Sequence, residues 1–89
     1  MAEQIKLKIV NSAGMHARAS TRFVQMANRF QAEVMVEKDG QEVNGKSIMG
    51  VLLLVASQGS EITLRCEGQD ERMCLQSLAE LVRDGFGEE

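Results

Sequence analysis

The chain has 89 residues, of which 44% are hydrophobic, and its formal net charge at pH 7 is -3. This length predicts one domain, residues 1–89, with a single modest core. The acidic balance and the absence of Trp and Tyr argue against nucleic-acid binding, which usually needs a basic excess and stacking aromatic side chains.

The first predicted elements are a strand and a helix. Residues 4–10 alternate between apolar and polar side chains, which predicts a strand with one buried face. Residues 17–29 carry apolar side chains at helical spacing and predict an amphipathic helix. Gly14 permits a tight turn between the two elements.

A hairpin follows the helix. Residues 32–38 alternate again, and Asp39-Gly40 is the pair typical of a two-residue type I′ turn. Residues 41–44 then form a short return strand.

The next segment is ambiguous. Residues 48–56 are apolar almost without a break, so periodicity does not separate a buried strand from a short helix. Ser47 as an N-cap favours a helix, whereas Gly50 weakens that prediction.

The last third of the chain predicts a strand, a helix and a tail. Residues 60–67 alternate cleanly, and Asp70 is placed to cap a final helix. Residues 85–89 follow that helix as a tail. We expect Met26 and Met73 to fill the core, as methionines at helical spacing usually do. The predicted apolar stripe of the final helix consists of Met73, Cys74, Leu78, Leu81 and Val82.

The element order is therefore β-α-β-β-α-β-α. Most of the predicted strands have one polar face, so we expect an antiparallel sheet with one side in water. The helices must then cover the other side. The predicted fold is α+β, a two-layer open-faced sandwich in which a four-stranded antiparallel sheet carries three helices on one face.

Other features limit the function. Cys66 and Cys74 form no Cys-x-x-Cys pair, so we expect reduced, partly buried thiols and no metal or redox site. No apolar run approaches membrane-spanning length and no basic and apolar leader precedes the first strand. We therefore expect a cytoplasmic protein without membrane insertion and without a cofactor.

The only histidine of the chain lies just before the first predicted helix. His16 is placed where several backbone N–H groups have no partner within the helix, and Arg18 adds a positive charge. A helix N-terminus with a guanidinium is a ready anion site. An imidazole at such a site could accept a phosphoryl group, although a lone histidine before a helix is more often a capping or surface residue.

Two motifs resemble a known family. Residues 14–18 (Gly-Met-His-Ala-Arg) are similar to the active-centre motif of the HPr family, the histidine-containing phosphocarrier proteins of the bacterial phosphotransferase system. Residues 44–51 (Asn-Gly-Lys-Ser-Ile-Met-Gly-Val) are similar to that family's second motif, around a regulatory serine. The motifs have the family's mutual spacing, and the resemblance covers essentially the whole chain.

The resemblance implies a role for several residues. His16 would be phosphorylated through Nδ1, Arg18 would be the cation beside it, and the backbone of Ala17 and Arg18 would bind the phosphate. Ser47 would be the regulatory phosphorylation site. The implied partner-binding residues are Met15, Thr21, Arg22, Ile48, Met49 and Leu52.

The resemblance also implies partners. A monomeric carrier would receive the phosphoryl group of phosphoenolpyruvate from Enzyme I and pass it to sugar-specific acceptor proteins of the Enzyme II A type, as a stoichiometric intermediate rather than a turnover enzyme. A serine kinase or phosphorylase would act on Ser47. The alternatives are a carrier of the same fold in a nitrogen-regulatory branch and a regulatory binding module that carries no phosphate. His16 argues against the last, since a binding module needs no imidazole there.

One residue departs from the family pattern. The family usually has proline after this arginine, and here the residue is Ala19. Alanine is an excellent helix former, so the first turn should survive with one more backbone donor near the phosphate. Some family members also bring a terminal carboxylate near the active centre, which residues 88–89 do not predict by themselves.

Overall fold

The computed structural model describes residues 2–88. The segment that is ambiguous by sequence begins as a helix, and the order of strands and helices is the predicted one. The elements are β1 (Glu3–Lys8), α1 (Ala17–Ala27), β2 (Glu33–Lys38), β3 (Gln41–Asn44), α2 (Ile48–Leu53), β4 (Glu61–Glu67), α3 (Glu71–Arg83) and the 3-10 helix η1 (Gly85–Gly87).

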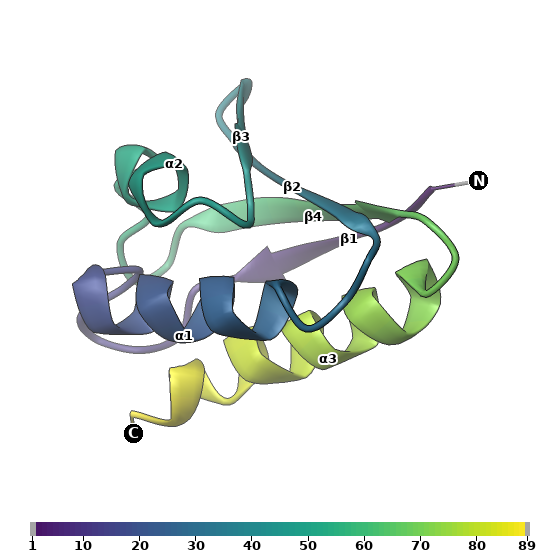
Figure 1. Cartoon of the computed structure of the whole chain (residues 1–89). Helices are drawn as coiled ribbons and strands as arrows, with labels where there is room; N and C mark the ends of the chain where they lie inside the picture. Colours follow the sequence, from purple (N-terminus) through teal and green to yellow (C-terminus); the bar gives the residue numbers. More distant parts are fainter. Residues whose placement is uncertain (1, 89) are drawn as a thin grey trace.

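The four strands form one antiparallel sheet in the order β1-β4-β2-β3. Figure 1 shows α1 and α3 side by side along one face of the sheet, with α2 near the β3 end. Asp39 and Gly40 in the β2–β3 turn have φ angles of 53° and 84°, as a type I′ turn requires. The fold is the predicted α+β open-faced sandwich.

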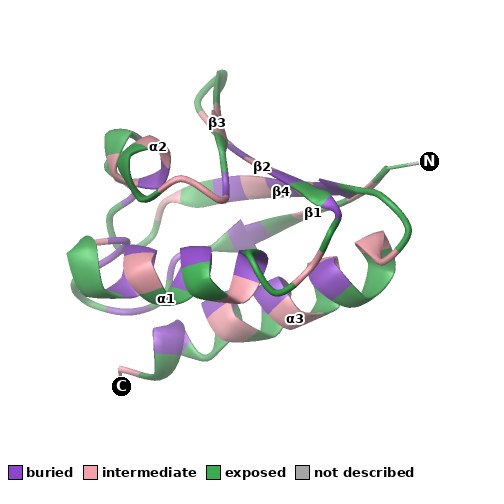
Figure 2. Cartoon of the chain, viewed as in Figure 1, coloured by how far each residue is buried: buried purple, intermediate pink, exposed green. Residues whose placement is uncertain are grey.

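The core lies between the sheet and the helices α1 and α3. Alternate residues of β4 are buried, as the sequence pattern predicts, and the intervening ones are more exposed. The buried positions of α1 and α3 face this layer (Figure 2). Because the buried face of α1 is held along its length, the N-terminus of that helix has a fixed position. The largest fully buried hydrophobic side chains are Phe23, Phe86, Ile9, Ile62, Leu64 and Leu78.

Two predictions for the last helix are wrong. Met73 is 65% exposed, whereas Met26 is half-buried against the core as expected. Asp70 precedes α3 but its side chain does not cap it. Its carboxylate instead accepts hydrogen bonds from the backbone N–H groups of Gln31 and Ala32, each at 2.9 Å. The bond from Gln31 is the main cause that lowers the pKa of Asp70.

The prediction of a tail is also wrong for residues 85–87. Residues 85–87 form η1, in which Phe86 is fully buried, and the helix packs against α1 and α3. The backbone carbonyl of Phe86 accepts a hydrogen bond from the Arg22 side chain. Glu89 lies outside the described residues. A single aromatic side chain that fills a gap in the core explains why the chain folds back here.

The two cysteines are free and fully buried, rather than partly buried as expected. Their Sγ atoms are 3.6 Å apart, on β4 and α3. Burial, together with the neighbouring Cys74, raises the pKa of Cys66 to about 12, so both thiols stay protonated. Separately, none of the helices in residues 2–88 is both long and apolar enough to cross a bilayer.

Candidate functional site

The loop between β1 and α1 is fixed against the connection from α2 to β4. Gly14 has a φ of +66°, and a Cβ atom there would lie 2.5 Å from the carbonyl oxygen of Ala56. The next residue, Met15, donates its N–H to that same oxygen at 2.9 Å. The buried Ser20 hydroxyl donates to the Met15 carbonyl at 2.9 Å. These contacts place His16 directly before the first turn of α1.

His16 is the N-cap of α1. Its backbone is extended, and its Nδ1 atom accepts a hydrogen bond from the N–H of Arg18 at 3.3 Å. The imidazole is about one-third exposed, with 34% of its side-chain surface accessible. Nδ1 therefore faces the unpaired N–H groups of the helix, where a helix can hold negative charge.

The other ring nitrogen is bound by a residue from the far end of the chain. Nε2 of His16 lies 2.7 Å from Oε2 of Glu88. Oε1 of Glu88 accepts a hydrogen bond from Nδ2 of Asn11 at 2.9 Å, and Nδ2 also donates to the Gly14 carbonyl at 2.8 Å. No sequence pattern around Asn11 or Glu88 predicts these contacts. The one signal in the sequence is Phe86 between two glycines, a pattern typical of a segment that turns and packs back.

These contacts control the charge of the Glu88 carboxylate. Partial burial by itself would raise the pKa of Glu88. The hydrogen bonds from Asn11 and His16, and the charges of His16 and Arg18, outweigh that effect and hold the pKa of Glu88 below its usual range. Glu88 is therefore an anion beside the ring at neutral pH.

The other implied residues of the motif lie on the outer face of α1. Ala17 and Arg18 are exposed in the first turn. The Thr21 hydroxyl donates to the Ala17 carbonyl at 2.8 Å, and the Arg22 side chain donates to the Phe86 carbonyl. Ala19, at the position of the family's proline, is the third residue of the helix and is fully buried.

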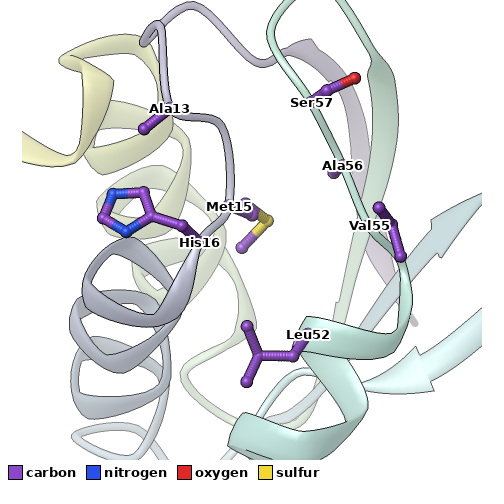
Figure 3. A pocket seen from close by; sticks show the side chains of 7 residues that line it. All are labelled: Ala13, Met15, His16, Leu52, Val55, Ala56 and Ser57. Atoms are coloured by element: carbon purple, nitrogen blue, oxygen red, sulfur yellow. The ribbon is translucent and has the colours of Figure 1, made fainter.

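A shallow pocket of about 290 Å³ lies beside His16. Figure 3 shows the side chains of Met15 and Leu52 pointing toward one another, while the His16 ring at the start of α1 points away from them. Met15 is only 4% exposed, so little of it is accessible for the partner binding that the resemblance implies. It lies below the surface and supports the loop. The pocket is lined by Ala13, Met15, His16, Leu52, Val55, Ala56 and Ser57.

Ser47 begins α2 in the same way that His16 begins α1. Its backbone is extended, and its Oγ accepts a hydrogen bond from the N–H of Gly50 at 3.1 Å. Helix α2 has only six residues and buries only Val51. The remaining apolar side chains form an exposed surface, here called the α2 patch. It consists of Ile48, Met49, Leu53 and Val55, with the half-buried Leu52 at its edge.

The α2 patch is wider than the sequence analysis expected. Ile48 is 41% exposed and Met49 is 75% exposed, as a docking surface requires. Leu53 and Val55 are at least as exposed as Ile48 but were not among the implied partner-binding residues. An apolar run gives no sign of which residues face outward when its helix is so short.

Comparisons with known proteins agree with this geometry. The family model described as "PTS HPr component phosphorylation site" matches residues 3–84. A protein named phosphocarrier protein HPr from Xylella fastidiosa is 45% identical over 84 residues, which cover 94% of each chain. The HPr-like protein Crh from Bacillus subtilis is 46% identical over 91% of this chain and 95% of its own.

A solved structure of HPr from Thermoanaerobacter tengcongensis superposes with a TM-score of 0.95. It is 42% identical in sequence, and the match covers 98% of both chains. The family model, the sequence relatives and the solved structure therefore agree on one family. The chain belongs to the HPr family, the phosphocarrier proteins of the phosphotransferase system.

Proposed function

We propose that His16 carries the phosphoryl group on Nδ1. The group would come from phosphoenolpyruvate through Enzyme I and pass to sugar-specific acceptor proteins in the cytoplasm. The observation that carries this proposal is the position of Nδ1, which faces the N–H of Arg18 at the start of α1 on a partly exposed ring. The protein would act as a stoichiometric intermediate, since each chain would take up one phosphoryl group and pass the same group on.

The charge balance suits a group that must be both held and released. A phosphoryl group carries about two negative charges, and a helix N-terminus stabilises such a charge by about 0.3–1 kcal/mol when it is exposed. The backbone N–H groups of Ala17 and Arg18 and the Arg18 guanidinium would add donors. Because the site is open to water, this stabilisation stays modest and the group remains available for onward transfer.

Ser47 and the α2 patch form the second half of the proposal. Enzyme I and the acceptors would dock on the patch next to His16 and would also contact Thr21 and Arg22. A phosphate on Ser47 would place charge at the edge of this apolar surface, which a partner tolerates poorly. The α2 N-terminus would tolerate the same charge, so the fold would persist. A serine kinase or phosphorylase is therefore the proposed regulator.

The test is a labelling reaction. The protein is incubated with Enzyme I and phosphoenolpyruvate, and protein-bound phosphate is measured before and after acid treatment. We expect about one acid-labile phosphate per chain, with none in His16→Ala, because the chain has a single histidine. A Ser47→Ala variant is the matched control and should take up the same phosphate. Labelling that survives in His16→Ala would contradict the proposal.

The relative named Crh keeps a regulatory role open as the second candidate. In that case the α2 patch beside Ser47 would bind a partner, and His16 would take up no phosphate. The same labelling reaction separates the two functions. Acceptor proteins of the sugar and nitrogen-regulatory branches, offered in parallel to the phosphorylated protein, decide which branch it serves.

A further inference from the structure

A second group holds the imidazole in addition to the helix. The C-terminal strap, defined here as residues 85–88, folds back so that the Glu88 carboxylate lies 2.7 Å from Nε2 of His16. A carboxylate can only accept a hydrogen bond, so a contact this short requires a proton on Nε2. At the same time Nδ1 accepts from the Arg18 N–H, so it carries a lone pair. Both contacts select the same tautomer of the neutral ring.

We propose that Glu88 is a positioning residue for phosphoryl transfer, which keeps the imidazole proton on Nε2 and leaves the Nδ1 lone pair facing the helix N-terminus. This inference rests on the proposed function and adds to it the residue that prepares His16. It concerns the side chain of Glu88 and its bond to the ring.

The strap holds Glu88 by two independent contacts. Phe86 is fully buried, although its φ of 58° is in the left-handed region that bulky residues rarely adopt. That strain persists because the ring fills the core and Arg22 binds the Phe86 carbonyl. On the other side, Asn11 donates to Oε1 of Glu88. The carboxylate therefore has one defined orientation.

The orientation of Asn11 is itself fixed. Its side chain is 1% exposed and its Nδ2 donates to both the Gly14 carbonyl and Glu88. The Oδ1 atom has no hydrogen-bond donor among residues 2–88. Turning the amide over would place that oxygen against two other oxygens, which is worse. The unpaired Oδ1 is thus the cost of aiming an N–H at Glu88.

The proton on Nε2 matters for the chemistry. When Nδ1 attacks, a bond forms between Nδ1 and phosphorus, and the bond from phosphorus to its donor on Enzyme I breaks with the electron pair left on the donor. The Nε2 proton stays in place, so the phosphorylated ring becomes a cation. The Glu88 carboxylate stabilises this developing charge. No proton has to move during the step.

Glu88→Gln is the sharpest variant because it keeps the shape of the side chain and turns one acceptor oxygen into an N–H donor. Asn11 still requires an oxygen opposite its N–H, so the Gln amide group has to face Nε2 of His16 and donate to it. The ring proton must then move to Nδ1, which loses its lone pair. Glu88→Ala removes the contact with Nε2, so neither tautomer of the ring is favoured by this residue. The tautomer populations of this variant should lie between those of the wild-type and Glu88→Gln proteins.

The first readout is the tautomer itself. The chain has one histidine, so ¹⁵N-histidine labelling gives a single pair of ring nitrogen signals. At about pH 9 an ordinary imidazole is neutral, and the two nitrogen shifts report where the proton is. We expect the proton on Nε2 in the wild-type protein and a shift toward Nδ1 in Glu88→Gln.

The second readout is the rate of phosphoryl uptake from phosphorylated Enzyme I in a single turnover. We expect a loss of about tenfold in Glu88→Gln, by analogy with the carboxylates that orient metal-bound histidines, whose mutation typically costs about 10–100-fold. A smaller loss is expected in Glu88→Ala. Asp84→Asn is the control, because it removes one negative charge from the same end of the chain. The Asp84 side chain makes no capping hydrogen bond to η1, so this variant should take up phosphate at the wild-type rate. Circular dichroism melts check that each variant is folded.

The outcomes separate this inference from the proposed function. The same tautomer in wild-type and Glu88→Gln proteins would overturn the inference, as would a changed tautomer with an unchanged rate. If the wild-type protein took up no phosphate at all, the proposed function would fail and with it the role of Glu88 in transfer. The nitrogen shifts would still decide whether Glu88 places the ring proton.

Discussion

Helices α1 and α2 begin alike, yet they are anchored very differently. In each, the N-cap residue has an extended backbone and a side chain that accepts a backbone N–H, with His16 bound to Arg18 and Ser47 bound to Gly50. The buried face of α1 consists of Ala19, Ser20, Phe23, Val24 and Ala27. That of α2 is Val51 alone.

The difference separates two tasks. A cap on a firmly packed helix keeps one position, and His16 is held further by Glu88 from the far end of the chain. A cap on a lightly packed helix lies at the edge of exposed apolar surface, which a partner can cover. The structure thus combines a rigid position for the proposed phosphoryl transfer with a neighbouring patch for the proposed docking. Five predictions test this comparison, from the largest effect to the smallest.

The largest effect is expected in the anchoring face of α1. Phe23→Ala should lower the free energy of unfolding by about 3–5 kcal/mol, because the side chain is fully buried and leaves a cavity. Chemical denaturation followed by circular dichroism measures it. Leu53→Ala on the α2 patch is the control and should change stability by less than about 0.5 kcal/mol. Similar losses in both variants would mean that α2 is anchored as firmly as α1.

The turn before α1 should be nearly as sensitive. Gly14→Ala adds a Cβ 2.5 Å from the Ala56 carbonyl oxygen at a φ of +66°. We expect a loss of about 3 kcal/mol from overpacking and backbone strain together, measured by thermal or chemical unfolding.

Gly59→Ala is the matched control for this change. Gly59 also has a positive φ, of +89°, but nothing lies within 4 Å of its added Cβ. It should lose only about 1 kcal/mol, from strain alone. Equal losses at the two positions would show that the Gly14 loop yields and does not fix His16.

The cap of α2 should affect binding more than folding. Ser47→Asp should weaken Enzyme I binding by about tenfold, or about 1.4 kcal/mol, because it places a charge beside the α2 patch. Asp is as good an N-cap as Ser, so stability should hold, whereas Ser47→Ala should lose about 1 kcal/mol. Calorimetric titration with Enzyme I and thermal melts measure the two effects. Unchanged affinity in Ser47→Asp would speak against docking at this patch.

The end of α2 carries strain that the end of α1 lacks. Val55 has a φ of 49°, unusual for a β-branched residue, and its side chain is 76% exposed. Val55→Gly should therefore raise the free energy of unfolding by about 1 kcal/mol. Val10→Gly, at an exposed residue outside the positive-φ region, should lower it. A destabilised Val55→Gly protein would indicate that the side chain packs more than its exposure suggests.

The smallest effect is the dependence of stability on pH. The hydrogen bonds from Asn11 and His16 hold the pKa of Glu88 below its usual range. Its contribution is therefore complete above the unfolded pKa and is lost as the pH falls through the lower, folded pKa. Melting temperatures measured from about pH 6 to pH 2 should fall less steeply with acid in Glu88→Ala than in the wild-type protein.

Ser47→Ala is the comparison for this titration. The Ser47 hydroxyl does not titrate in this range, so the variant should be less stable than the wild type by the same amount at every pH. Asp70, whose pKa is also low, contributes the same acid dependence to all three proteins and cancels. Parallel curves for Glu88→Ala and the wild-type protein would show that the strap carboxylate is not coupled to folding.

Features that depend on neighbouring residues can be predicted from the amino-acid sequence. Alternation predicted the strands, Asp39-Gly40 predicted the type I′ turn, and the helical spacing after His16 placed that residue at the start of a helix. Ser47 favoured a helix after it but did not exclude a strand. Each of these features rests on hydrogen bonds or side-chain spacing within about four residues. The resemblance to a family then supplied the roles implied for His16 and Ser47.

The surroundings of those residues depend on how the sheet and the helices pack together. The Glu88 carboxylate contacts the ring of His16, 72 positions earlier in the chain, and the Asp70 carboxylate binds the backbone just before β2. Phe86 is buried and Met73 is exposed. No local pattern encodes such contacts, because they form only when the sheet and helices have packed and set distant segments side by side. The contact of Nδ1 of His16 with the helix therefore depends on residues close to it in the sequence. The contact of Nε2 with Glu88 depends on the tertiary fold.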